Sequence, residues 1–146
     1  MEDSDRTIVA LLARDGRLSY TEVARATGLS TSAVHQRVRR LEARGVIRGY
    51  AALVDCEAIG LALTAFVSIT PTDPSAPDDA PTRLEAMTEI EACHSVAGQE
   101  SYILKVRVAT PGDLEVLLAR IRAEAGVSTR TTIVLSTPYE GRPPVI

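Results

Sequence analysis

The sequence predicts an α+β protein in which a three-helix, helix-turn-helix domain is followed by a ferredoxin-like βαββαβ domain. Helical spacing of apolar residues in the first 50 positions is the first observation behind this prediction, and strict alternation of apolar residues beyond position 60 is the second. The third is charge, because residues 1–50 carry a net +3 and residues 51–146 a net −6. We expect a helix-turn-helix domain over 1–50, a strand and connector over 51–62, and a ferredoxin-like domain over 63–146.

The first predicted helix covers residues 3–16. Ile8, Leu11 and Leu12 lie at helical spacing behind an acidic start, and Gly16 is suited to ending the helix. This pattern predicts a helix with one apolar side.

Two further helices are predicted to follow at once. Ser19 and Glu22 have the spacing of a capping box, and Gly28 ends that second helix. Ser30 is placed to cap a third helix over 31–44. The short connection at Gly28 is typical of a helix-turn-helix.

The rest of the chain is predicted to alternate between strands and helices in the order β-α-β-β-α-β. A proline-rich loop over 70–81 separates the first strand of that domain from its first helix. The expected strands are 61–69, 91–98, 101–109 and 128–136, and a further short strand is expected within 46–55. The expected helices are 82–90 and 111–126, the second of them capped by Asp113.

The third helix has a basic exposed side. A helical wheel places Val34, Val38 and Leu41 on the buried stripe, and Arg37 at its edge. Residues 37–48 contain five arginines against one glutamate, so we expect no acidic partner for this surface within its own domain. Serine, glutamine and arginine match base edges and phosphates in the major groove of a double helix. The candidate DNA-binding residues are Ser30, Thr31, Ser32, His35, Gln36, Arg37, Arg39 and Arg40.

Three alternatives compete with sequence-specific binding of duplex DNA. An arginine-rich helix side can simply be solvated, or the helices can dock onto an enzyme as part of an amino-acid-binding regulatory subunit. The third alternative is an architectural DNA-binding protein that has no effector. The exposed side lacks the apolar centre that protein docking favours, which argues against the second alternative.

Three segments resemble the Lrp/AsnC family of feast/famine transcriptional regulators: "GLSTSAVHQRVRRLEARGVIRGY", "DSDRTIVALLARDGRLSYTEVA" and "VAGQESYILKV". The similarity extends over nearly the whole chain. It implies a winged type of DNA-binding domain and a βαββαβ domain that dimerises through its sheet. It also implies octamers built from four dimers, with amino acids bound between dimers.

The loop near Gly98 is the candidate effector site. From the residues alone, free backbone N–H groups beside Gly98 could hold a carboxylate, and Glu100 could accept from an ammonium group; a plain turn is the alternative reading. By resemblance, this is the family's effector loop, although Ser101 stands where many relatives have aspartate. We expect a small or an apolar amino acid as effector. The candidate residues are Val96, Gly98, Gln99, Glu100, Ser101, Tyr102 and, more weakly, Thr132.

The sequence offers little for other functions. His94 and Ser95 are neighbours on a predicted strand and so point to opposite faces, which excludes them as a base and nucleophile pair. Cys56, Cys93 and His94 lack zinc-ligand spacing, and no nucleotide-binding glycine motif is present. The longest apolar run, residues 8–13, is too short for a membrane span, and the acidic start argues against a secretory signal. We therefore expect a cytoplasmic, non-enzymatic protein without a metal or cofactor.

Overall fold

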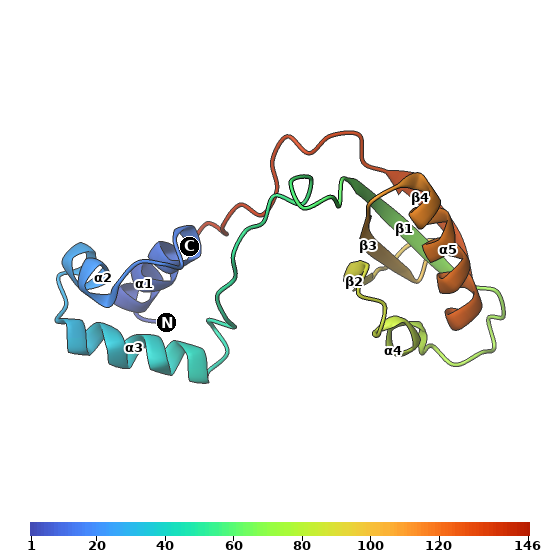
Figure 1. Cartoon of the computed structure of the whole chain (residues 1–146). Helices are drawn as coiled ribbons and strands as arrows, with labels where there is room; N and C mark the ends of the chain where they lie inside the picture. The colour runs from blue at the N-terminus through green and yellow to red at the C-terminus, as the bar shows by residue number, and fades with distance from the viewer. The chain divides into compact units, whose positions relative to one another are not determined.

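The computed structural model describes residues 1–146, which form two compact units (Figure 1). Unit 1 contains residues 1–53 and 138–146, and unit 2 contains residues 54–137. The helices are α1 Asp3–Arg14, α2 Tyr20–Thr27, α3 Thr31–Ala43, α4 Ala80–Leu84 and α5 Pro111–Ala125. The strands are β1 Leu63–Pro71, β2 Ile90–Ser95, β3 Tyr102–Val108 and β4 Val127–Ile133. None of these helices has the length and apolar content needed to cross a membrane.

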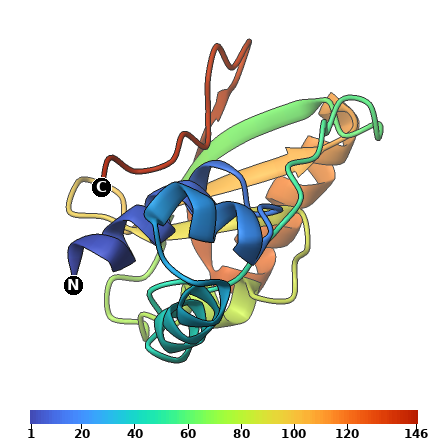
Figure 2. The same cartoon turned by 90° about the vertical axis from the view of Figure 1, so that its left-hand side faces the viewer.

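The helices of unit 1 begin and end at the residues that the sequence indicated. The Ser19 hydroxyl accepts from the Glu22 N–H while the Glu22 carboxylate accepts from the Ser19 N–H, which completes the capping box. Gly28 ends α2 at φ 71°, in the left-handed region where a side chain is strained. In Figure 2, α3 is viewed almost along its axis, with α1 and α2 on one side of it.

A single core joins these three helices. Each helix contributes its apolar stripe to a cluster formed by Ile8, Leu12, Val23, Ala24, Val34, Val38 and Leu41. Because α3 gives three fully or almost fully buried residues to this cluster, its inward side is fixed by hydrophobic burial.

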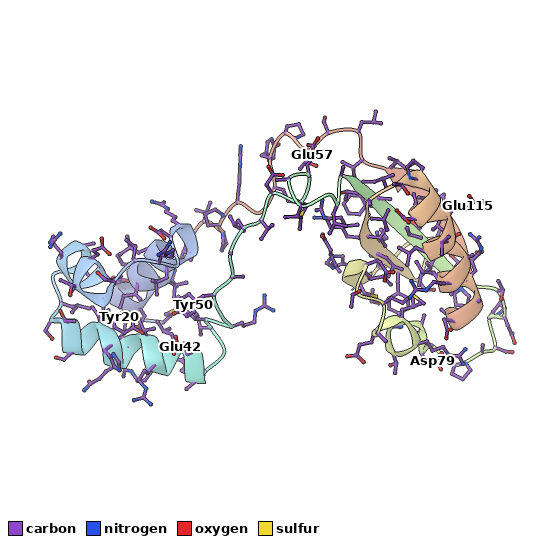
Figure 3. The ribbon with its side chains drawn as sticks, in the orientation of Figure 1. Tyr20, Glu42, Tyr50, Glu57, Asp79 and Glu115 are labelled. Carbon is purple, nitrogen blue, oxygen red and sulfur yellow. The ribbon has the colours of Figure 1, made fainter.

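The short strand expected within 46–55 is absent, and that prediction is wrong. No strand of the chain pairs with this segment, and an isolated strand leaves its backbone hydrogen-bonding groups without partners. The chain instead turns back onto α3, where the N–H groups of Val46 and Ile47 donate to the Leu41 carbonyl. The Tyr50 hydroxyl donates to Glu42 at 3.0 Å (Figure 3), and burial, followed by this bond, raises the pKa of Tyr50 to about 12.

Unit 2 is a four-stranded antiparallel sheet in the order β2-β3-β1-β4 with the helices on one face. Ala65, Val67 and Ile69 of β1 are fully buried beneath the helices, whereas Phe66 between them is 40% exposed on the other face. This alternation and the order of the elements confirm the predicted α+β fold with its βαββαβ domain.

Several boundaries in unit 2 differ from the predicted ones. Strand β1 occupies 63–71 and not 61–69, so it includes the first two residues of the predicted loop, and β2 occupies 90–95 and not 91–98. Helix α4 occupies 80–84 and not 82–90, because Pro81 is favoured in a first helical turn and the chain enters β2 at Ile90. Thr110, and not Asp113, is the N-cap of α5, and Asp113 completes the capping box from the third position. Strand β4 ends at Ile133, so residues 134–136 lie outside it.

Candidate nucleic-acid interface and effector loop

The side of α3 that faces away from the core is open to solvent. Val34, Val38 and Leu41 have exposed fractions of 0%, 0% and 1%, which fixes the opposite side of the helix outward. Nitrogen-bearing side chains project from this side, away from α1 and α2 (Figure 3). The exposed predicted residues on α3 and at its start are Ser30, Thr31, Ser32, His35, Gln36, Arg39 and Arg40.

The hydroxyl groups at the start of α3 are partly used within the helix. The Ser30 Oγ accepts from the Ala33 N–H at 3.2 Å, as a capping serine does, and lies 3.2 Å from the Ser32 Oγ. No intrachain acceptor takes the backbone N–H groups of Thr31 and Ser32. An anion near this helix end would meet two unused donors and the positive end of the helix dipole.

The predicted arginines of α3 have different surroundings. Arg39 and Arg40 are exposed and form no ion pair with any carboxylate of the chain. Arg37 is 21% exposed, and its Nη1 lies 2.7 Å from Glu2 and 2.8 Å from Asp5. The expectation that this surface has no acidic partner within its domain is therefore wrong for Arg37 and correct for Arg39 and Arg40.

His35 is exposed but has a ring partner. Its imidazole meets the ring of Tyr20 edge-on, with centroids 5.2 Å apart and planes at 89°. Tyr20 opens α2, so this contact ties the exposed side of α3 to the preceding helix. Sequence reasoning missed Tyr20, because nothing in the local pattern shows which residue of α2 lies beside position 35.

The loop between β2 and β3 is anchored at its ends. The Val96 N–H donates to the Ser101 carbonyl, and the Ser101 N–H donates to the Ile69 carbonyl at 3.0 Å. Between these anchors, the N–H groups of residues 97–100 have no acceptor within the chain. Gly98 has no positive φ, so the turn itself does not require glycine here. A Cβ at position 98 would lie 3.9 Å from the Glu100 carboxylate, so the missing side chain leaves space beside that group.

A polar hollow of about 190 Å³ adjoins this loop. Its charged groups are the Glu100 carboxylate, which is 19% exposed, and the Arg130 guanidinium 3.7 Å away. The lining residues are Ser68, Thr70, Gln99, Glu100, Ser128, Thr129 and Arg130. The hollow therefore offers one cation, one anion and several hydroxyl groups, which suits a small zwitterion.

Only part of the predicted effector set meets at this hollow. Gln99 and Glu100 line it, whereas Tyr102 packs against the core beneath the sheet and donates its hydroxyl to Asp78 at 2.9 Å. That bond raises the pKa of the Tyr102 phenol. Thr132 is exposed on β4 opposite Phe66 and is absent from the lining, as are Val96, Gly98 and Ser101.

The lining residues that sequence reasoning missed come from β1 and β4. Strand pairing sets Ser68 opposite Arg130 and Thr70 opposite Ser128. The run of five polar residues at 128–132 was a visible signal, but which of them line a site depends on the strand beside which β4 lies.

Comparisons with known proteins agree with this arrangement. Residues 1–48 match the family model for winged helix-turn-helix DNA-binding domains, and residues 64–144 match the model for the Lrp/AsnC ligand binding domain. The HTH-type transcriptional regulator LrpA of Mycobacterium tuberculosis is 58% identical over 142 residues, which cover 97% of this chain and 95% of that protein. The leucine-responsive regulatory protein of Escherichia coli is 38% identical over 136 residues, covering 90% and 82%.

Solved structures give the same result. The crystal structure of the M. tuberculosis leucine response regulatory protein LrpA has a TM-score of 0.92 and 55% identity, with 100% of both chains covered. A feast or famine regulatory protein from M. tuberculosis complexed with L-methionine has a TM-score of 0.97 and 56% identity, with 99% of each chain covered. The chain belongs to the Lrp/AsnC family of transcriptional regulators, with a DNA-binding helix-turn-helix domain and an amino-acid-binding domain.

Proposed function

We propose that the exposed side of α3 enters the major groove of duplex DNA and reads its sequence. The observation that carries this proposal is the exposure of Arg39 and Arg40 without any acidic partner, beside a fully buried stripe that fixes their direction. Bidentate contacts from arginine to guanine and from glutamine to adenine are the pairings that such a side offers. Residues 1–50 are then the DNA-binding domain, residues 51–62 the connector, and residues 63–146 the effector-binding and oligomerisation domain.

In this proposal, the start of α3 contacts the phosphate groups of the DNA backbone. The unused N–H groups of Thr31 and Ser32 and the nearby hydroxyls position the protein on the backbone, and Gln36, Arg39 and Arg40 supply base or further phosphate contacts. His35 lies at the edge of this surface, held by its contact with Tyr20.

The assembly that we propose is a homodimer that builds octamers in the cytoplasm. The open face of the sheet, with Phe66 40% exposed, supports pairing through the sheet. Two free cysteines suit a reducing compartment. A two-fold dimer reads a roughly palindromic site with half-sites about one helical turn, or a multiple of it, apart. The protein acts in this proposal as a regulator without catalytic activity or cofactor.

Selection of bound duplexes from a random pool, followed by affinity measurements across salt concentrations, tests the DNA-binding side. If each subunit engages about three phosphates, the log-affinity of a dimer falls with log salt at a slope near −5. Affinity that is independent of salt, or a pool with no enriched palindrome, would contradict the proposal.

We propose further that the effector is an α-amino acid held at the hollow beside the β2–β3 loop. The free N–H groups of residues 97–100 and Arg130 suit its carboxylate, and Glu100 suits its ammonium. The similar M. tuberculosis protein complexed with L-methionine supports this class of ligand. The hollow's own lining is polar, so the panel of ligands must include small polar amino acids as well as apolar ones.

Calorimetric titration of the full chain with single amino acids tests this second part. We expect binding that is lost in Glu100→Gln and Arg130→Met and kept in Arg83→Met, whose arginine pairs with Asp79 away from the hollow. The absence of binding by every amino acid at millimolar concentration would reject the effector proposal and leave the DNA-binding proposal standing.

A further inference from the structure

Arg37 differs from the other arginines of α3 because its guanidinium group is paired with carboxylates. A single nitrogen, Nη1, lies 2.7 Å from the Glu2 carboxylate and 2.8 Å from the Asp5 carboxylate, and both acids belong to the start of α1. The two acids are 35 and 32 residues away in the chain, so these bonds hold two helices together. Both acids, and Asp5 most strongly, raise the pKa of Arg37, which stays charged.

Asp5 needs this partner. It is 8% exposed and is the only buried charged residue of the whole chain. A buried carboxylate is costly unless a cation and hydrogen bonds compensate for the lost water, and Arg37 is the only cation that reaches it. Glu2 occupies the N-cap position of α1 yet makes no side-chain cap bond, because its carboxylate is directed to Arg37.

The apolar stripe of α3 fixes its inward side but not its fine rotation. Val34, Val38 and Leu41 bury area without directional bonds, and apolar contacts of this kind tolerate small repacking. The Arg37 bonds are directional and sit at the edge of the stripe, so they resist rotation of the helix about its axis. Any such rotation would move Arg39 and Arg40 away from their partners on a ligand.

We propose that Glu2, Asp5 and Arg37 form a clamp that fixes the rotational setting of α3, so that Arg37 is a positioning residue for DNA binding and makes no phosphate contact. The inference rests on the proposed DNA-binding side of α3. The three groups sum to a net charge of −1, which repels a phosphate, whereas Arg39 and Arg40 carry uncompensated positive charge.

A positioning role and a phosphate-binding role of Arg37 predict different changes in operator affinity for the same variant. Asp5→Asn removes an acid from the clamp and leaves Arg37 in place. If Arg37 positions the helix, operator affinity weakens; if Arg37 binds phosphate, the freed arginine and the lost negative charge leave affinity unchanged or tighten it. Arg6→Met is the matched control, because Arg6 is exposed beside Asp5 and forms no ion pair.

The experiment measures operator affinity at several salt concentrations for the full chain, with circular dichroism confirming that each variant is folded at the assay temperature. We expect Arg37→Met to weaken binding about tenfold and Asp5→Asn several-fold, with the double variant about as weak as Arg37→Met alone. The slope against log salt stays as in the wild type, and Arg6→Met stays within about twofold.

A slope that falls by about 2 per dimer in Arg37→Met, together with unchanged or tighter binding by Asp5→Asn, would assign Arg37 to phosphate and overturn the clamp. Folded variants that have a lower melting temperature but wild-type affinity would reduce the clamp to a stabilising contact and overturn its positioning role. If Arg37→Met does not fold, the direction of the change in operator affinity of Asp5→Asn alone decides between the two roles of Arg37. Failure of the wild type to bind DNA would instead reject the proposed function itself.

Discussion

Basic side chains have opposite surroundings in the two units. In and just after α3, four of the five arginines, all but Arg37, have no carboxylate partner: Arg39, Arg40, Arg44 and Arg48. In residues 54–137, five of the six basic side chains have one: Arg83, Lys105, Arg107, Arg120 and Arg130. Exposed ion pairs contribute only about 0–1 kcal/mol each, so this difference concerns the surface presented to ligands more than stability.

The charge cluster of β3 illustrates the paired pattern. Glu91 accepts from Arg107 and lies 3.6 Å from the Lys105 Nζ, and both cations are 17% exposed. Hydrogen bonding to Arg107 holds the pKa of Glu91 below its ordinary value of 4.5. A polyanion meets cations that share a carboxylate on this strand and cations without a carboxylate partner on α3. Because salt screens charges over about 8 Å, the whole-chain charge of −3 has little effect on an anion bound at α3.

The largest expected effect tests whether the two units, which differ in charge, also unfold independently of each other. Leu41→Ala and Ile121→Ala each delete a buried side chain from a different core, and each should lower the free energy of unfolding of its own unit by about 2–5 kcal/mol. Hydrogen exchange read by mass spectrometry separates peptides of the two units. Equal loss of protection in both units after either change would show that the two units do not unfold independently.

A second effect tests the unpaired arginines directly. The double change Arg39→Met and Arg40→Met should weaken operator affinity by about a hundredfold or more, because a dimer loses four major-groove or phosphate contacts. The matched control is Arg83→Met with Arg120→Met, which removes two paired cations of unit 2. Fluorescence anisotropy on the selected duplex and on scrambled duplexes provides the measurement.

The pattern of that loss sharpens the assignment. Uniform loss on all duplexes with a smaller salt slope identifies phosphate contacts, and relaxed preference at one base pair identifies a base contact. If the control weakens binding as much as the α3 double variant, the unpaired charges have no special role.

The smallest expected effect is on the stability of the protein at acid pH. Because the folded-state pKa of Glu91 is lowered, its contribution to stability is present above pH 4.5 and is lost as the pH falls through the folded-state value. The side chain is 35% exposed, so solvent screening limits the contribution to under about 1 kcal/mol. Urea unfolding from pH 7 to pH 3 should show a shallower acid decline for Glu91→Gln than for the wild type. Identical declines would show that the cluster contributes nothing measurable.

Local signals predicted most of the fold. The Ser19 and Glu22 capping box, the Ser30 cap and the left-handed Gly28 each depend on residues within a few positions of one another. The alternation of Ala65, Val67 and Ile69 likewise follows from strand geometry alone. Such features are encoded where they occur, which is why the exposed side of α3 was predictable.

The remaining features depend on contacts between distant segments. The Arg37 bond to Asp5, the ring contact of Tyr20 with His35 and the pairing of Ser68 with Arg130 all require knowledge of which elements are neighbours. The wrongly predicted strand within 46–55 has the same origin. Its residues suit a strand, but strand formation needs a pairing partner that the sequence pattern does not reveal.

Both ends of the chain belong to unit 1, since residues 138–146 return to it after β4. In connectivity, unit 2 is thus an insert held by two covalent tethers, and only residues 134–137 separate the end of β4 from the returning tail. Strand β4, which carries Arg130, is therefore joined to unit 1 by the four residues 134–137, whereas β1 is joined to it by the longer connector 51–62. A displacement of β4 can be transmitted to unit 1 through the shorter of these two connections.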